Sequence, residues 1–252
     1  MNIVASTLTS SGHVDAPACP RLDGRLVARA QLTDGARHAM FALLASHFAG
    51  VDRSTFDADL ADKNWVILLE DEERRLRGFS TLLIYHTEAA GVPATVVYSG
   101  DTIVDRGWWG SPALPRSWIH AVRRLAPMES GGDLYWLLLT SGYRTYRFLP
   151  VFYRRFYPRH NEPTPPAMQC LMRALARERF GGAYDPSDGI VRFPRPQILK
   201  RDLLDVPDGR REDPHVAFFL TTNPGFARGD ELLCLTRVHD DNLTPAAHRM
   251  LR

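Results

Sequence analysis

Residues 94–114 read ATVVYSGDTIVDRGWWGSPAL, and the elements that this stretch predicts indicate the fold class. The segment Ala94 to Val104 is rich in β-branched residues and predicts a long strand. A glycine-containing turn follows, and Ser111-Pro112 is typical of the N-cap and first position of a helix. The apolar run inside Asp133 to Ser141 then predicts a buried strand, which a helical crossover would make parallel to the first.

The segments on either side of this stretch predict a mixed α/β chain. Two earlier strands, Asn64 to Glu70 and Gly78 to His86, are joined by short loops and favour an antiparallel meander. The other predicted strands are Leu26–Gln31, His215–Thr222 and Glu231–Val238, the last two forming a hairpin around Asn223-Pro224-Gly225. The first predicted helix starts at Thr33 and ends at Gly50. The other predicted helices cover Ser54–Asp62, the segment after Ser111, Thr145–Phe156 and Met168–Phe180.

Composition excludes several classes of protein. With 252 residues, 44% apolar and 24% charged, the chain is neither disordered nor a disulfide miniprotein. The net charge of 31 − 29 = +2 does not argue for a nucleic-acid partner. The three cysteines, Cys19, Cys170 and Cys234, form no CxxC pair, and no histidines have metal-ligand spacing, so no metal site is expected. No apolar run has the length of a membrane span and the N-terminus lacks signal-peptide features, which predicts a cytoplasmic protein with no membrane partner.

The turn between the long strand and the next helix has the residues of an anion site. Arg106, Gly107, Gly110 and Ser111 combine a cation, small residues and a helix start, where backbone N–H groups can point at a phosphate. Together with the order of elements, this turn resembles the GNAT (GCN5-related N-acetyltransferase) superfamily. The resemblance covers roughly Leu26 to Pro158 and identifies the chain as a divergent member.

The resemblance implies a thioester donor. GNAT proteins move an acyl group from coenzyme A, or from a carrier-protein thioester, to an amine. In this family the long strand parts from its parallel neighbour and pairs with the pantetheine arm, which here implies Thr102, Ile103 and Val104. Gly100 suits such a distortion, although a packing role explains it as well. Because Trp108 and Trp109 occupy the turn and Pro112 lacks an N–H, a bare phosphopantetheine arm on an acyl carrier protein is the alternative to acyl-CoA.

Two residues are predicted to be catalytic. Tyr153 falls where GNAT proteins carry a tyrosine near the donor sulfur, which implies that it protonates the departing thiolate; Tyr157 replaces the family's glycine. Asp101 is the candidate general base, with Glu88 and His86 as alternatives. Both also have a purely structural interpretation, Tyr153 as a core aromatic and Asp101 as a residue that stabilises a bulge.

The fold class predicted is α/β (α+β): a GNAT-like mixed, mostly antiparallel sheet flanked by helices, with a C-terminal helix and β-hairpin extension. Residues 1–24 are predicted to be a flexible arm, 25–160 the acyltransferase core, and 161–252 an extension that completes the sheet and covers the acceptor pocket. The function predicted is transfer of an acyl group from acyl-CoA or a carrier protein to a small-molecule amine, in a chain that could form homo-oligomers. An inactive ligand-binding or interaction protein is the alternative, and a nucleic-acid module based on the arginine-aromatic segment 141–160 is a weaker one.

Overall fold

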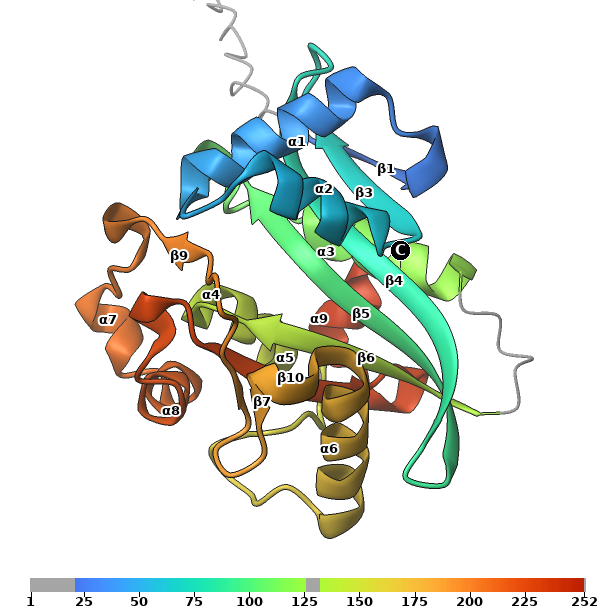
Figure 1. Cartoon of the computed structure of the whole chain (residues 1–252), viewed down its shortest axis with the longest axis vertical. Helices are drawn as coiled ribbons and strands as arrows, with labels where there is room; N and C mark the ends of the chain where they lie inside the picture. The colour runs from blue at the N-terminus through green and yellow to red at the C-terminus, as the bar shows by residue number, and fades with distance from the viewer. Residues whose placement is uncertain (1–20, 126–131, 252) are drawn as a thin grey trace, which may run out of the picture.

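The centre of the fold is an eight-stranded sheet with the strand order β1-β3-β4-β5-β6-β10-β8-β7, seen in a computed structural model that describes residues 21–125 and 132–251 (Figure 1). The strands of this sheet are β1 (Asp23–Ala28), β3 (Trp65–Glu70), β4 (Leu76–Ala89), β5 (Val92–Val104), β6 (Asp133–Thr140), β7 (Tyr184–Asp185), β8 (Ile190–Val191) and β10 (Glu231–Arg237). A separate small sheet pairs β2 (Phe48–Ala49) with β9 (Ile198–Leu199).

Among the described strands of the large sheet, only one pair of neighbours is parallel. The strands β1, β3, β4 and β5 pair antiparallel in turn, β5 and β6 run parallel, and β10 returns antiparallel on the other side of β6. The predicted meander and the predicted parallel strand are therefore confirmed. The strand predicted at Glu231 to Val238 is also confirmed as β10, which lies between β6 and β8.

Helices cover both faces of the sheet. Their bounds are α1 (Asp34–His47), α2 (Arg53–Ala61), α3 (Ala113–Leu125), α4 (Tyr143–Tyr146), α5 (Phe148–Phe152), α6 (Pro166–Phe180), α7 (Asp208–Arg211), α8 (Pro214–Thr222) and α9 (Pro245–Met250). Short 3₁₀ turns are η1 (Arg29–Gln31), η2 (Arg106–Trp108), η3 (Gly181–Ala183), η4 (Arg201–Leu203), η5 (Phe226–Arg228) and η6 (Asp240–Asn242). Within the described ranges, none of the helices is long and apolar enough to cross a bilayer.

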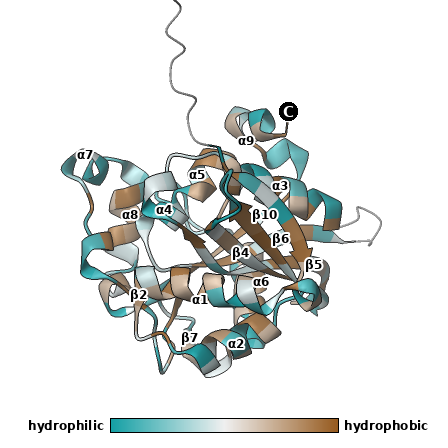
Figure 2. Cartoon of the chain, turned by 90° about the horizontal axis from the view of Figure 1, so that it is seen from above, coloured by the Kyte–Doolittle hydropathy of each residue, from teal (hydrophilic) through white to brown (hydrophobic). Residues whose placement is uncertain are grey.

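The central strands are buried on both sides, which divides the core into three clusters. On β6, Trp136 and Leu138 face a cluster with α3, α5, α8 and α9, whereas Tyr135, Leu137 and Leu139 face α6 on the opposite side. The helices α1 and α2 form the third cluster with β1, β3 and β4. Because successive side chains point to opposite faces, a strand covered on both faces reads as an unbroken apolar run. Figure 2 shows the strands β6 and β10 in brown, between helices of mixed colour on either side.

Local signals set most helix starts. The Thr33 hydroxyl accepts from the Ala36 N–H at the start of α1, and the Asp52 carboxylate accepts from the Thr55 N–H at the start of α2. The Ser111 hydroxyl accepts from the Ala113 N–H where α3 begins. These starts agree with the predicted positions to within one or two residues.

Two predictions about elements are wrong. The predicted strand His215–Thr222, half of the expected hairpin, is helix α8. Asp213 caps the N-terminus of this helix and Pro214 is its first residue. The period of the apolar run fits a strand or a helix, and the capping residues favour the helix. The single helix predicted over Thr145–Phe156 is instead two short helices, α4 and α5, that end before Tyr153. Residues 1–20 of the predicted arm lie outside the described residues, and Asp23 and Gly24 belong to β1.

Candidate active site

The parallel pair β5–β6 separates partway along its length. The two strands are paired from Ala94 opposite Asp133 to Ser99 opposite Leu138, where the pairing stops. Beyond this point β5 continues to Val104 and stays paired with β4 on its other side. From Gly100 onward, the edge of β5 that faces β6 is therefore free of pairing with any described strand.

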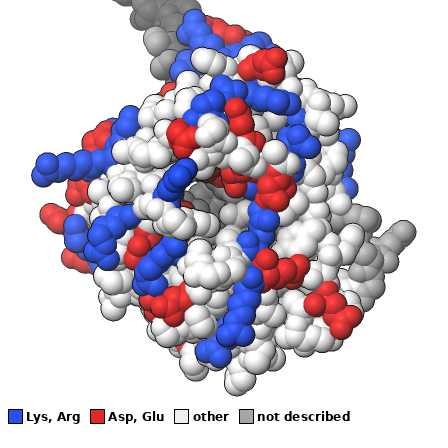
Figure 3. Space-filling model, viewed as in Figure 1, with Lys and Arg blue, Asp and Glu red and all other residues white. Residues whose placement is uncertain are grey.

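A cavity of about 840 Å³ opens where the strands part, and its volume lies in the range of small-molecule sites. Its lining includes Ser99 through Val104 of β5 and Leu138 and Leu139 of β6. Figure 3 shows a hollow on the face viewed in Figure 1, with basic and acidic side chains around it.

The lining of the cavity comes from both faces of the sheet. Ser99, Trp118 and Tyr153 belong to the side covered by α3 and α5. Tyr98 and Glu231 belong to the opposite side, where α2 and α6 pack. The cavity thus joins the two faces through the opening between β5 and β6, so that ligands on either face can meet there.

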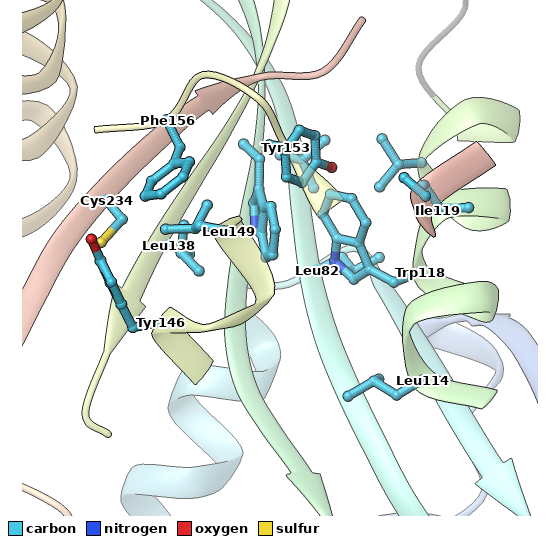
Figure 4. Packing of buried hydrophobic residues seen from close by; sticks show 14 of the residues in the cluster. Leu82, Leu114, Trp118, Ile119, Leu138, Tyr146, Leu149, Tyr153, Phe156 and Cys234 are labelled. Carbon is cyan, nitrogen blue, oxygen red and sulfur yellow. The ribbon is translucent and has the colours of Figure 1, made fainter. Parts of the chain in front are cut away.

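Hydroxyls and indoles line the α3 side. Tyr153 is 2% exposed, and its hydroxyl has no hydrogen-bond partner among the described residues. Its ring centroid lies 5.8 Å from that of Trp136, which in turn lies 4.2 Å from that of Trp118. Figure 4 shows Trp118 projecting from α3 toward Tyr153 in this packed group. Burial raises the pKa of Tyr153, so its hydroxyl stays protonated and available as a donor.

Carboxyl groups gather on the α2 side around one buried lysine. Lys63 is 2% exposed, and its ammonium group donates to the Asp59 carboxylate at 2.7 Å and to the Asp59 carbonyl at 3.0 Å. The Lys63 ammonium also lies 5.4 Å from the centroid of the Tyr98 ring. Asp59, Asp101 and Glu231 all line the cavity, and the Oδ2 atom of Asp101 is buried without a partner among the described residues.

Burial and mutual repulsion shift the pKa values of these carboxyls. Burial, followed by the charge of Asp59, raises the pKa of Asp101 to about 7, against a lowering effect of Lys63 and of a hydrogen bond from Gln197. Burial, followed by Asp101 and Asp59, raises the pKa of Glu231 to about 8. A carboxyl whose pKa is close to neutrality is well matched to accept and release protons.

A bulge at Gly100 places Asp101 in this group. Between Ser80 and Leu82 of β4, the partner residues on β5 advance from Thr102 to Ser99, so β5 carries one extra residue. A Cβ at Gly100 would lie 2.6 Å from Lys63 Cε and 2.6 Å from Thr81 Oγ1. The absence of a side chain at Gly100 therefore leaves room for the Lys63 side chain beside the carboxyls. Both the bulge and the close approach predicted for this glycine are present.

The predicted phosphate turn is largely satisfied by its own bonds. Within it, the Gly107 N–H donates to the Asp105 carboxylate, and the N–H groups of Trp108, Trp109 and Ser111 donate to carbonyls of the turn. Arg106 forms an ion pair with Asp202. These bonds leave few of the turn's donors for an anion.

Trp109 covers part of the free edge of β5. Its indole N–H donates to the Val104 carbonyl at 2.8 Å, and Arg144 stacks over the ring with its Cζ 4.4 Å from the ring centroid. Arg144 also donates to the Leu203 carbonyl. Trp109 and Arg144 thus connect the turn after β5 to α4 across the opening between the strands.

The structure brings most of the predicted site residues to one cavity, and the others lie close by. The predicted residues that line the cavity are Asp101, Thr102, Ile103, Val104, Ser111 and Tyr153. Arg106, Gly107 and Gly110 lie in the adjacent turn and are not part of the lining. His86, an alternative base, is instead bonded to Thr95 and, like Glu88, is not part of the lining.

Sequence reasoning missed several residues of the cavity. The sequence places Ser99 and Trp136 only in predicted strands, Trp118 only in a predicted helix, and Glu231 only at the start of a predicted strand. Asp59 was assigned only to a short helix, and Lys63 drew no prediction. The extra β5 residue at Gly100 could have pointed to the position of Asp101, but nothing in the sequence shows that β10 brings Glu231 alongside β6.

Among the described residues, no group of three or more His, Cys, Asp or Glu side chains could hold a metal ion. Cys170 and Cys234 are free thiols, exposed and buried respectively, and Cys19 lies outside the described residues.

Comparison with known proteins gives a partial match. No protein-family model matches the sequence, and no curated protein matches it. A probable N-acyltransferase from Enterococcus faecalis is 12% identical with a TM-score of 0.38 over 54% of this chain and 33% of its own. The GNAT family N-acetyltransferase YhbS from Escherichia coli, in complex with CoA, is 16% identical with a TM-score of 0.38 over 52% of this chain and 69% of its own.

An aminoglycoside N-acetyltransferase, AAC(6')-Iy in complex with CoA, is 16% identical with a TM-score of 0.37 over 53% of this chain and 86% of its own. This chain spans about a third of the length of the first two similar structures. The similarity is too limited to assign the activity or ligands of those proteins to this one.

The assignment of the fold rests on the geometry itself. The antiparallel meander, the crossover through α3, the parallel strand β6 and the separation of β5 from β6 are the features that the resemblance predicted. The chain is a divergent protein with a GNAT-like fold.

Proposed function

We propose that this chain is an N-acyltransferase that moves an acyl group from an acyl-CoA thioester to the amine of a small molecule. The observation that carries the proposal is the cavity that joins both sheet faces where β5 leaves β6. An unpartnered tyrosine hydroxyl faces it on one side, and half-buried carboxyls with raised pKa values face it on the other.

The donor side of the cavity is the α3 side. The free edge of β5 from Gly100 to Val104 offers backbone groups to the amides of a pantetheine arm, as an added strand would. Four arginines in the lining, Arg144, Arg147, Arg195 and Arg210, supply positive charge for phosphates. The role assigned to Arg106, Gly107, Gly110 and Ser111 in phosphate binding stays part of the proposal, and it requires the turn to exchange some of its internal bonds for the anion.

The residues supply the proton transfers that the reaction needs. Asp101 accepts a proton from the ammonium form of the acceptor, directly or through water, and leaves a neutral amine. The new C–N bond forms at the thioester carbonyl and the C–S bond breaks. Tyr153 donates its proton to the departing sulfur, the newly bonded nitrogen gives its second proton to the tyrosinate left behind, and Asp101 releases its proton to solvent.

The acceptor side is the α2 side, where Asp59, Asp101 and Glu231 favour a cationic amine. Here β10, which belongs to the C-terminal segment 161–252, supplies Glu231. This supports the proposal that the extension helps to enclose the acceptor pocket. A carrier-protein thioester as donor, a homo-oligomeric assembly and a cytoplasmic location stay predictions.

A binding protein without turnover is the second candidate, because Trp109 and Arg144 bridge the opening through which a donor would lie. Thermal shift and turnover separate the two. Acetyl-CoA and longer acyl-CoAs should raise the Tm, and release of free thiol should follow addition of a suitable amine from a panel of small polyamines and amino sugars. A Tm shift with no thiol release for any amine would favour the binding protein, and no shift with any acyl-CoA would contradict the proposed acyl-CoA donor.

A further inference from the structure

Ser99 holds an unusual position in the sheet. It is the last residue of β5 that is paired with β6, opposite Leu138, so its side chain lies where the two strands part. The side chain lines the cavity and is on the same face as Tyr153. Ser99 is 8% exposed, and its hydroxyl is therefore almost fully withdrawn from water.

Two tryptophans occupy the acceptor positions of this hydroxyl. The indole N–H of Trp118 donates to Ser99 Oγ at 3.1 Å, and the indole N–H of Trp136 donates to the same atom at 2.9 Å. A serine hydroxyl has two lone pairs and one proton, and an indole N–H can only donate. Both lone pairs of Ser99 are thus used, and the only hydrogen bond left for it to make is one in which it donates.

No acceptor for the Ser99 proton is present among the described residues. A buried hydroxyl that gives up its bonds to water without a partner costs about 1–3 kcal/mol. The two N–H groups also polarise the O–H bond and make it a stronger donor. The site therefore carries a fixed donor directed at whatever occupies the cavity.

The position is unsuited to a nucleophile. Among the residues that the structure describes, no histidine, carboxylate or lysine is bonded to Ser99 to take its proton, and the lone pairs that would attack are held by the indoles. A donor role requires neither a base nor a free lone pair. The arrangement favours hydrogen bonding over covalent chemistry.

Tyr153 supplies a second free donor on the same face, and its ring packs against the Trp136 indole that donates to Ser99. A thioester has two acceptor atoms that gain negative charge during acyl transfer, the carbonyl oxygen and the sulfur. With Tyr153 assigned to the sulfur, the carbonyl oxygen needs a donor at the point where the strands part. Ser99 is located there.

We propose that Ser99 is a catalytic residue whose hydroxyl, held in place by Trp118 and Trp136, donates a hydrogen bond to the carbonyl oxygen of the thioester. This inference rests on the proposed acyl transfer and names the donor that stabilises the oxyanion. The hydroxyl keeps its proton throughout, so no bond to Ser99 forms or breaks. Loss of one such donor typically lowers kcat by about 100-fold or more.

The test uses the full chain and acyl-CoA labelled with ¹³C at the carbonyl, in both acetyl and octanoyl forms. We expect Ser99→Ala to lower kcat about 100-fold with the donor KM changed less than about threefold. The infrared carbonyl band of bound acyl-CoA should lie below its solution frequency in the unaltered chain and return toward it in Ser99→Ala. Ser99→Thr, which keeps the hydroxyl, should restore part of both effects.

Ser187→Ala is the control, because Ser187 lies in the turn between β7 and β8, outside the lining of the cavity, and its hydroxyl donates to the Asp185 carboxylate. It should leave kcat and the carbonyl band unchanged. Should Ser99→Ala fail to fold, Trp118→Phe removes one of the two N–H donors and should move the band partway toward its solution frequency.

The outcomes separate the two proposals. Binding of acyl-CoA with turnover, but with the same carbonyl band and kcat in Ser99→Ala, would overturn the role of Ser99 alone. An acyl adduct on Ser99 in the intact mass would overturn it in favour of a nucleophile. Failure of both acyl-CoAs to bind the unaltered chain would overturn the proposed function together with this inference.

Discussion

Tyr153 carries a hydroxyl that is buried, protonated and without a partner among the described residues. If it protonates the leaving thiolate, Tyr153→Phe should lower kcat by about 100-fold or more and change donor affinity little. The same change removes an unsatisfied polar group, so the Tm should stay the same or rise. A stopped assay of thiol release and a thermal melt measure both effects.

Tyr146 provides the matched control for this substitution. Its hydroxyl donates to the Pro158 carbonyl at 2.9 Å, so Tyr146→Phe should lower the Tm while leaving the donor KM unchanged. Turnover that is unaltered in Tyr153→Phe would remove Tyr153 from the mechanism.

Asp101 predicts a pH dependence of turnover. Burial and Asp59 raise its pKa to about 7, and only the ionised form can accept the proton of the amine. The rate should therefore rise with pH, with a midpoint near 7, and Asp101→Asn should remove most of the activity together with this limb. A pH profile that keeps the same limb in Asp101→Asn would assign the base to another group.

The same group predicts a pH dependence of stability. The pKa of Asp101 is about 7 in the folded chain against 3.8 as its ordinary value, so the folded state binds the proton more tightly. Its contribution to stability is present below about pH 4 and is lost as the pH rises through 7. Thermal melts should show Asp101→Asn gaining stability over the unaltered chain at pH 8 but not at pH 4, whereas an equal difference at both would contradict the shift.

Asp101 and Tyr153 could be chosen as candidates from the sequence, because Asp101 falls on a predicted strand, Tyr153 falls near the end of a predicted helix, and the resemblance implies a role for each. The group of Ser99, Trp118 and Trp136 could not be predicted. Trp118 is 19 residues from Ser99 and Trp136 is 37 residues from it, and only the fold brings the two indoles to one hydroxyl. At the level of sequence, a buried strand accounts for Trp136 and a helix for Trp118. The sequence does not show which polar atom accepts a hydrogen bond from each buried indole N–H.

At the scale of elements, the bulge in β5 is the feature that sets the site. A Cβ on residue 100 would meet Lys63 and Thr81, each at 2.6 Å, and Thr81 is itself buried. Gly100→Ala should therefore destabilise the fold by about 1–3 kcal/mol and lower the rate by shifting Asp101. Urea unfolding and a turnover assay measure the two effects.

Gly182→Ala is the control, because a Cβ there meets nothing within 4 Å. It should change the free energy of unfolding by less than about 0.5 kcal/mol. Equal effects of the two substitutions would show that Gly100 has no special contact.

The bond from Trp109 to Val104 is a second feature at this scale. If the Val104 carbonyl pairs with a pantetheine amide, the indole N–H competes with the donor for it. Trp109→Phe keeps a ring but removes the N–H, and should tighten the Kd of coenzyme A about 2- to 10-fold by calorimetry. A weaker or unchanged Kd would mean that the donor does not use this carbonyl.

Strands and helices with clear period and capping were predictable, and ambiguous apolar runs were not. The meander follows from the strand patterns and short loops, α3 from the Ser111-Pro112 start, and α6 from an apolar stripe at helical spacing. The run His215–Thr222 fits a strand or a helix equally, and the Asp213 cap with Pro214 decides for α8. The stop before Tyr153 likewise depends on contacts with residues 242–244, far along the chain.

At the scale of the whole molecule, the segment after residue 160 is part of the site. It returns as β10 beside β6 and carries Glu231 into the cavity near Asp101. The sequence predicted that this segment completes the sheet, but not that β10 lies between β6 and β8. Pairing over such a separation is set by the packing of α6 and α8 against opposite faces, which no local pattern encodes.

The most direct measurement is a crystal structure of the chain with acetyl-CoA, or with a non-hydrolysable analogue of it. It should show the pantetheine arm along the free edge of β5 beyond Ser99, with its sulfur near the Tyr153 hydroxyl and the acyl group directed toward Asp101. A ligand bound outside this opening would contradict the account. So would a structure at saturating ligand concentration in which β5, β6 and the Trp109 indole leave no room for the ligand.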